Sequence, residues 1–329
     1  MIKRKMLLVA MSVFVVMILL GPSPAPAKKP IVLKAVSFVP LHFVDNTPLR
    51  ELISRIKQKS NGELVIDFAG AFDVIPVYDQ AEAVRKGVVD MSMSFVAVYS
   101  KLVPEVQSLT YSEIEPWEER QRGYFDYMVD LHKKTNLRYL GRSIIQEPCF
   151  YFLSNKRIVK IGDFAGMKFC TGPVFVPVLK ALGASGVVMP QPDKYGAMER
   201  GLVDGINNPL ILSEQLHLYE VSKYFLDYGL FKADTTFIMN LDKWNNLPKH
   251  LQELLINETG AIERDMKAYF DSKATDAKKK FKDAGVQFIY LSSDDTKKLQ
   301  DIATESCWAE IAKSISPENY SKLRKLLSK

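Results

Sequence analysis

Thiols and imidazoles are the side chains with the chemistry for nucleophilic catalysis or zinc binding, and both are sparse in this sequence. The three cysteines, Cys149, Cys170 and Cys307, form no CxxC pair, so neither a zinc site nor a dithiol redox centre is indicated. The four histidines are scattered singly and no HExxH motif occurs, which disfavours a metal hydrolase. At most one disulfide can form among three cysteines.

Cys170 is the thiol whose surroundings come closest to those of a nucleophile. It follows an apolar strand and precedes a helix expected to begin near Pro173, and a helix N-terminus favours the thiolate. A cysteine hydrolase also needs a base beside the sulfur, and no motif places His42 or His217 there. No GxSxG, SxxK or glycine-rich phosphate loop is present. An exported hydrolase is therefore a weak alternative, and we expect no enzyme activity.

Asn207 and Asn208 offer a different chemistry, which is recognition by hydrogen bonds. Each amide has donors and an acceptor, which suits a carboxylate, hydroxyl or carbonyl group of a small ligand. Because Pro209 follows them, the same segment can also simply turn the chain. For Asn207 both interpretations stay open.

The elements that must position these residues follow a segment with the pattern of a secretory signal peptide. Basic residues 3–5 precede an apolar run at 6–20, and Ala25-Pro26-Ala27 supplies small residues for cleavage. The run is shorter than the about 20 residues of a membrane span, although an uncleaved anchor stays an alternative. Half of the formal net charge of +6 lies in this segment, which disfavours a nucleic-acid partner. We expect residues 1–27 to be removed and the mature protein to be periplasmic.

The rest of the 329-residue chain alternates strand and helix patterns and is long enough for about two domains. Residues 31–38 are β-rich, a helix begins at Thr47, and residues 64–68 alternate as a short strand. A further helix ends at Gly87, and a strand at residues 88–95 follows it. The predicted fold class is therefore α/β.

One short pattern occurs twice. Residues 87–90 and 201–204 each place a glycine where a helix ends, then two apolar residues and an aspartate. Any joint between a helix and a strand can look like this, but the similar flanks favour two related lobes. Residues 250–284 form the longest periodic segment and contain no proline. Such a helix would be about 50 Å long, which is longer than one small lobe, so we expect it to span both.

Further motifs follow in order along the mature chain. They are Asp163 with Gly166-Met167-Lys168, the segment 195–201, Val203-Asp204-Gly205, Asn208-Pro209 and the segment 244–248. In this order and spacing the chain resembles the substrate-binding proteins of TRAP transporters, the DctP-type family. The resemblance covers nearly the whole mature chain. It implies a two-lobed periplasmic-binding-protein fold that closes about a hinge on a small organic ligand.

The resemblance also implies how the lobes are joined and what they serve. Strands would cross between the lobes near Glu147 and Asp234, and the long helix would brace both lobes. Lobe I would comprise residues 31–147 plus 234–273, and lobe II residues 148–233 plus 274–329. The closed form of a monomer would deliver the ligand to TRAP-type membrane permease subunits, without a cofactor. The same cleft could instead serve a membrane sensor, and the sequence does not separate the two.

The loops around the expected cleft follow the strands. Ligands of open α/β sheets lie beyond the carboxyl ends of the strands, where helix N-termini present free N–H groups. The loops at those ends are residues 40–45, 71–76, 92–99 and 170–177, with residues 207–209 facing them from the second lobe. Asn208 matches the family's ligand-contacting asparagine.

Two positions depart from the family pattern. The arginine that pairs a substrate carboxylate in most members is replaced by Cys170. A second arginine, used by some members, would align near Phe150 and is also missing. A cysteine cannot replace a fixed positive charge, and a buried carboxylate without a partner costs several kcal/mol.

Three kinds of ligand binding therefore stay open. A neutral or aromatic ligand, which we favour, would be held by the asparagines and by aromatic side chains that fit core positions equally well, namely Phe72, Phe95, Tyr99, Phe150 and Phe175. An acid would be bound by another cation, with His42, Lys168 and Arg142 as candidates. Arg142 is expected early on its strand, where a surface charge fits equally well. A metal would bridge the acid to Glu147 or Asp73.

Overall fold

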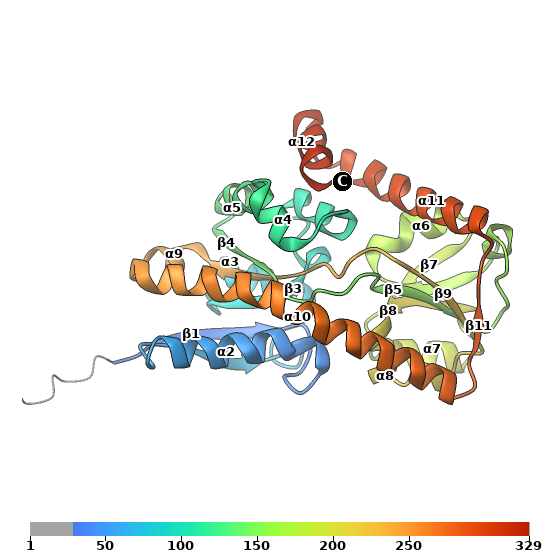
Figure 1. Ribbon diagram of the computed structural model, residues 1–329, viewed down its shortest axis with the longest axis horizontal. Coiled ribbons are helices and arrows are strands. Elements are labelled where there is room, and N and C mark those ends of the chain that lie inside the picture. Colours follow the sequence, from blue (N-terminus) through green and yellow to red (C-terminus); the bar gives the residue numbers. More distant parts are fainter. Residues whose placement is uncertain (1–28, 329) are drawn as a thin grey trace, which may run out of the picture.

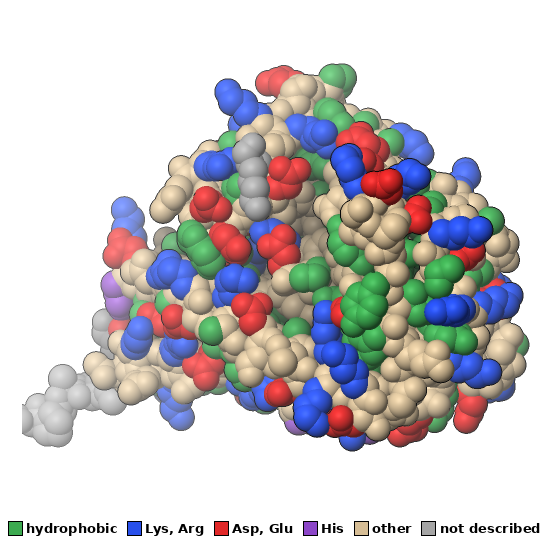
Figure 2. Space-filling view, turned by 45° about the vertical axis from the view of Figure 1, so that its right-hand side comes forward, with side chains coloured by type: hydrophobic (Ala, Val, Ile, Leu, Met, Phe, Trp, Pro, Cys, Tyr) green, Lys and Arg blue, Asp and Glu red, His purple; other side chains and the backbone are tan. Residues whose placement is uncertain are grey.

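The computed structural model describes residues 29–328 as two α/β lobes, each built around one sheet, which confirms the expected fold class (Figure 1). The expected signal segment, residues 1–27, lies outside the described residues. Within the described part of the chain, no helix is both long and apolar enough to cross a membrane. Lys and Arg side chains are interspersed with Asp and Glu over the face shown in Figure 2.

The first sheet has five strands in the order β2-β1-β3-β10-β4. Their bounds are β1 Ile31–Ser37, β2 Leu64–Gly70, β3 Met91–Phe95, β4 Leu137–Arg142 and β10 Thr235–Asn240. β1 pairs in parallel with β2 and β3, whereas β10 is antiparallel to β3 and β4. The strand expected at residues 88–95 begins only at Met91, because the N–H of Val88 bonds back to the carbonyl oxygen of Ala83, 2.9 Å away.

The second sheet has six strands in the order β11-β9-β5-β8-β6-β7. Their bounds are β5 Phe150–Ser154, β6 Lys168–Thr171, β7 Ser185–Val188, β8 Gly205–Pro209, β9 Tyr224–Leu230 and β11 Gln287–Ile289. β6 pairs in parallel with β7 and β8, whereas β5 is antiparallel to β8 and β9. The carboxyl ends of β6 and β8 therefore lie at one edge of the sheet, the place where α/β proteins bind ligands.

Helices pack against both sheets (Figure 1). Their bounds are α2 Thr47–Lys59, α3 Gln80–Arg85, α4 Pro116–Gln121, α5 Tyr124–Lys133, α6 Val176–Ala181, α7 Asp193–Glu199, α8 Leu210–Gln215, α9 Leu241–Asn245, α10 Lys249–Asp283, α11 Ser293–Ala312 and α12 Pro317–Leu327. Ordinary start signals explain several of them. Pro48 lies in the first turn of α2, and the side chains of Ser292 and Ser316 accept backbone N–H groups at the starts of α11 and α12.

The pattern that occurs twice in the sequence makes the same joint in both lobes. Each of its glycines has a left-handed backbone, with φ of +72° and +66°. The Asp90 carboxylate accepts the backbone N–H of Lys34 in β1 at 2.8 Å. The Asp204 carboxylate accepts the backbone N–H of Lys168 in β6 at 2.9 Å. The aspartate thus ties the joint to the neighbouring strand in each lobe.

The long helix predicted at residues 250–284 is α10, which runs through 35 residues. Leu255 and Ile262 pack in the core of the first lobe. Ala277 and Phe281, farther along the same helix, pack in the core of the second lobe. Figure 1 shows α10 passing along both lobes, as expected.

Besides α10, which leads from β10 to β11, two shorter segments cross between the sheets, residues 143–149 between β4 and β5 and residues 231–234 between β9 and β10. The two crossings are hydrogen-bonded to each other. The N–H of Ala233 donates to the carbonyl oxygen of Gln146 at 2.9 Å, and the N–H of Cys149 donates to that of Phe231 at 2.8 Å. We propose these paired segments as the boundary between the lobes.

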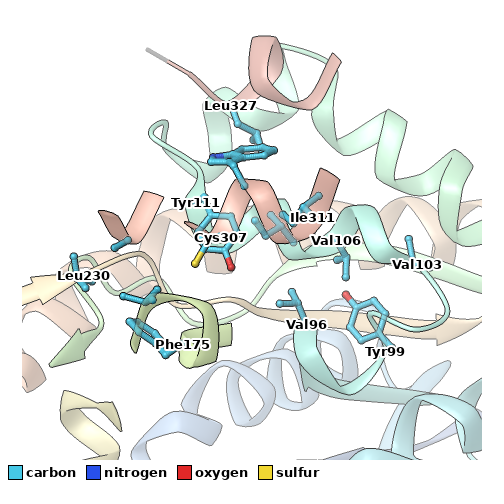
Figure 3. Close-up of a cluster of buried hydrophobic side chains, with 14 of the residues drawn as sticks. Val96, Tyr99, Val103, Val106, Tyr111, Phe175, Leu230, Cys307, Ile311 and Leu327 are labelled. Atoms are coloured by element: carbon cyan, nitrogen blue, oxygen red, sulfur yellow. The ribbon is translucent and has the colours of Figure 1, made fainter. Parts of the chain in front are cut away.

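A cluster of buried hydrophobic side chains lies under α11 (Figure 3). Tyr111 comes from the 3-10 helix η4, Pro104–Tyr111, and lies beside Cys307 of α11, while Phe175 comes from the second lobe. α12 continues from α11 and packs on α5 and η4 of the first lobe. All three cysteines are buried and free, so the one disulfide that the sequence allows is not formed.

Candidate functional site

A buried polar network surrounds Asn208, the residue before the end of β8. Asn208 Oδ1 accepts a hydrogen bond from Lys194 Nζ at 2.7 Å, and Asn208 Nδ2 donates to Ser213 Oγ at 3.2 Å. Ser213 in turn donates to the carbonyl oxygen of Pro209 at 2.7 Å. Lys194, Asn208 and Ser213 are each 1% exposed. The Asn208 amide is therefore held in one orientation.

Three neighbouring elements bring this network together. β6 lies beside β8 with Cys170 opposite Ile206. α7 begins at Asp193, so Lys194 lies in its first turn. α8 follows β8 directly, which places Ser213 within one helical turn of the strand end.

Lys194 is the buried cation of this network. Burial lowers its pKa to about 8, with the nearby Cys170 acting in the opposite direction. Its side chain therefore still carries a positive charge at neutral pH. Among residues 29–328, no carboxylate forms an ion pair with this ammonium, and its hydrogen-bond partner is the neutral Asn208.

Cys170 does not have the properties of a nucleophile. It is completely buried, and burial raises the pKa of its thiol although the Lys194 ammonium acts to lower it. A catalytic thiol needs the opposite shift and a base beside the sulfur. His42 and His217, the candidate bases, both have exposed side chains. The structure therefore gives the hydrolase alternative no catalytic pair.

Asn207 takes part in a separate set of contacts. Its Nδ2 donates to the carbonyl oxygen of Tyr151 at 3.4 Å, and its Oδ1 accepts from Thr171 Oγ1 at 3.5 Å. Successive residues of a strand face opposite sides of the sheet, so Asn207 and Asn208 serve different surroundings. Ligand contact by Asn207 stays a prediction.

Two of the predicted aromatic residues meet in the second lobe. The Phe150 ring, at the start of β5, lies 5.0 Å from the ring of Phe175, which lies 5.4 Å from that of Phe231. Phe175 is buried in the core, whereas Phe150 is only partly buried. Phe150 therefore keeps surface that a ligand can contact.

The predicted aromatic residue Phe95 of the first lobe packs against the same core cluster as Phe150. Phe95, at the end of β3, is partly buried and makes edge contacts with Phe38 at 5.7 Å and Tyr78 at 6.1 Å. Phe72, in the loop after β2, is 43% exposed, and Tyr78 is 52% exposed. Phe38, Phe95 and Tyr78 thus form an aromatic group on the first lobe.

Tyr99 belongs to the core of the first lobe rather than to a ligand surface. Its side chain is fully buried, its hydroxyl lies 2.7 Å from Thr236 Oγ1, and its ring lies 5.5 Å from that of His132. The 3-10 helix η3, Val96–Val98, follows β3 and turns the chain back into the core. A position shortly after a strand was therefore not enough to place this ring at the ligand edge.

Arg142 corrects a second expectation. It is the last residue of β4 rather than an early one, and it is buried rather than at the surface. Its Nε lies 3.2 Å from Glu119 Oε2, and its guanidinium donates to the carbonyl oxygens of Ala233, at 3.3 Å, and Leu109. Its charge is therefore already neutralised within the fold.

The other charged candidates are exposed. His42 and Lys168 have exposed side chains, and Glu147 Oε2 pairs with Lys232 Nζ at 2.8 Å. Asp73 Oδ1 accepts the N–H of Ala71 in its own loop at 3.0 Å. In the part of the chain that the structure describes, no three His, Cys, Asp or Glu side chains form a group that could hold a metal ion.

Comparisons with known proteins identify the family and the fold. The sequence model of the bacterial extracellular solute-binding proteins of family 7, DctP, matches residues 42–314. This chain belongs to that family. An uncharacterized protein of Haemophilus influenzae is 32% identical over 101 residues, which are 30% of this chain and only 31% of that protein. A solute-binding protein of Albidiferax ferrireducens is 21% identical over 287 residues, 80% of each chain.

Solved structures agree with this DctP assignment. A TRAP periplasmic solute-binding protein from Desulfovibrio salexigens, with bound orotic acid, has a TM-score of 0.80 and 20% identity, and the match covers 90% of this chain and 97% of that one. At this identity the likeness shows the fold. The family and its structural neighbours are binding proteins, so this DctP protein is a solute-binding protein and not an enzyme.

Sequence reasoning about this DctP protein missed Lys194. The sequence signal was a lysine in the first turn of a helix, directly before the motif at residues 195–201. Lysine is ordinarily exposed in such a position, so nothing in the sequence indicated a buried ammonium beside Asn208. The burial follows from how α7 packs against the ends of β6 and β8.

Asp45 is a second buried charged residue that sequence reasoning did not single out. It lies in the 3-10 helix η1, Val44–Asn46, and is 4% exposed. Its Oδ2 has no hydrogen-bond partner among the described residues, and burial raises its pKa to about 7. Next to it, the N–H of Val44 donates to Gln215 Oε1 of the second lobe at 3.0 Å. Asp45 therefore lies where the two lobes meet.

Proposed function

We propose that this DctP protein captures a small organic ligand between its lobes in the periplasm and delivers it to the membrane subunits of a TRAP-type transporter. Asn208, which matches the family's ligand-contacting asparagine, carries the proposal. It is buried at the carboxyl end of β8 and is held by hydrogen bonds to Lys194 and Ser213. An amide that is already oriented loses little further freedom when a ligand binds.

Capture would work by a shift between two forms of the protein. The open form dominates without ligand, and ligand contacts to both lobes stabilise the closed form. The paired crossings at residues 143–149 and 231–234 would act as the hinge. α10, which packs in the cores of both lobes, would stay continuous during this motion. The membrane subunits would select the closed form by its shape.

Thermal unfolding of ligand-free protein tests this proposal. The purified protein is denatured, dialysed and refolded to remove any carried ligand, and is then screened against organic acids, sugars and aromatic compounds. A compound present at about a hundredfold excess over its Kd stabilises the folded state by about 2.7 kcal/mol and raises Tm.

Asn208→Ala should reduce that shift in Tm. Asn257→Ala, an exposed position on α10, is the matched control and should leave the shift unchanged. Ligand capture would be refuted if no compound raised Tm and the protein as isolated released no small molecule.

A further inference from the structure

We propose that Lys194 supplies the positive charge that binds an organic anion, in place of the family arginine that Cys170 replaces in this chain. The inference rests on the proposed ligand capture and names the class of the ligand, a small organic acid whose carboxylate contacts the Lys194 ammonium. It reverses the preference for a neutral ligand that the sequence alone favours.

The Lys194 ammonium is buried without a counter-charge. It is 1% exposed, and its hydrogen-bond partner among the described residues is the neutral Asn208 Oδ1, 2.7 Å away. An ammonium has further N–H groups to donate. No carboxylate of residues 29–328 pairs with it within 4.0 Å. An unpaired buried charge is costly, so an anionic ligand would stabilise the site by supplying the missing negative charge.

Lys194 and Cys170, which stands where the family has its arginine, lie on different elements. Cys170 lies on β6, whereas Lys194 lies on α7. Cys170 and two residues of α7, Ala197 and Met198, belong to the same buried cluster, so α7 packs against β6 at this place. A cation is thus present at the same strand edge.

Asn208 is oriented to act together with this cation. Its Oδ1 accepts from Lys194, and one N–H of its Nδ2 donates to Ser213. The amide group has a second N–H. One carboxylate can therefore accept hydrogen bonds from Lys194 and Asn208 at the same time, and hydrogen bonds to an ionised acceptor are the stronger kind.

A purely structural lysine would make a different prediction. If the ammonium served only to hold Asn208, Lys194→Met would weaken the binding of acids and of neutral ligands alike. A lysine that binds the ligand's charge predicts a selective loss of acids. The ligand-free variant should then be as stable as the parent or more so, because a buried unpaired charge has been replaced by an apolar side chain.

The experiment measures Kd by calorimetry for matched compounds that differ in a carboxylate. The pairs are orotate with uracil, D-glucuronate with D-glucose, and benzoate with benzamide. An acid should bind the ligand-free parent protein, and its neutral counterpart should bind far more weakly. Lys194→Met should weaken the acid about 100-fold. Lys180→Met, at an exposed lysine in the last turn of α6 in the same lobe, is the matched control and should change Kd less than about twofold.

A double variant tests whether a positive charge on β6 can replace the one that Lys194→Met removes from α7. Cys170→Arg added to Lys194→Met should restore most of the acid binding, because it puts a fixed positive charge back at the same strand edge. A merely structural lysine would not be rescued in this way. Lys194→Arg keeps the positive charge on α7 and should retain acid binding. This variant provides the test of charge if the double variant does not fold.

Each outcome decides between the two proposals. Binding of neutral compounds alone, or equal acid binding by Lys194→Met and the parent, would overturn the inference and leave ligand capture standing. If no acid in the panel binds, mass spectrometry identifies any small molecule that the protein as isolated releases. An acid that Lys194→Met no longer retains supports the inference, and an uncharged molecule overturns it. If nothing binds and nothing is released, the proposed function itself fails.

Discussion

Two basic side chains of this protein are equally buried, Arg142 in the first lobe and Lys194 in the second, each 1% exposed. Arg142 has the carboxylate of Glu119 3.2 Å from its Nε and donates to two backbone carbonyl oxygens. Lys194 donates to one neutral amide, that of Asn208. Burial by itself therefore does not mark a binding site. The missing counter-charge is what separates a cation of the ligand site from a cation of the fold.

The places of the two residues explain this difference. Arg142 ends β4 directly before the first crossing and donates to Ala233 in the second crossing, so it ties the two crossings together. Such a cation must be neutralised at all times. Lys194 lies at the strand edge where α/β proteins bind ligands, and a cation that captures an anion must be free when the site is empty.

Replacing Arg142 should cause the largest loss of stability among these predictions. Arg142→Met leaves Glu119 buried without its cation, and breaking such a pair costs about 3–5 kcal/mol. Urea unfolding should show this loss. Arg55→Met, the control, breaks a partly exposed pair with Asp265 and should cost less than about 1 kcal/mol. An equally small cost for both variants would contradict the structural role of Arg142.

Asp45 is a buried acid that, like Lys194, has no counter-charge among the described residues. Burial raises its pKa to about 7, above its ordinary value of 3.8, so the fold favours the protonated carboxyl group. The stability that this shift contributes is present in acid and is lost as the pH rises from about 4 through about 7.

Asp45→Asn removes this titration because an amide stays neutral. Between about pH 4 and about pH 8 the free energy of unfolding of the variant should rise by about 4 kcal/mol relative to that of the parent, because a pKa difference of one corresponds to about 1.4 kcal/mol. Unfolding is measured for both proteins at both pH values. A difference that does not change with pH would show that Asp45 does not titrate as its burial predicts.

The smallest expected effect is a change of ligand affinity with pH, which would distinguish Lys194 from the permanently charged Arg142. Burial lowers the pKa of Lys194 to about 8, so the free protein loses this charge as the pH rises through that value. The Kd of a bound acid should then rise by up to about tenfold per pH unit. Lys194→Arg, whose guanidinium stays charged, should show no such rise. An equally steep rise in both proteins would assign the titration to another group.

Local patterns in the sequence were enough for much of the fold. The helix expected at residues 250–284 is observed at Lys249–Asp283, because its periodic apolar residues and the absence of proline act within the segment itself. The joints at Asp90 and Asp204 also follow from short patterns. Tyr99 and Arg142 were misplaced, because their surroundings come from segments far away in the sequence.

The sequence by itself determined the order of strands and helices, the two similar joints, the long helix and the resemblance to one family. These features depend on neighbours along the chain, so they can be recognised before the chain is folded. Only the tertiary structure decided which cation stands beside Asn208. Asn208 on β8 and Lys194 on α7 come together only when the helix packs against the strand ends, and the charge balance of a site depends on that packing.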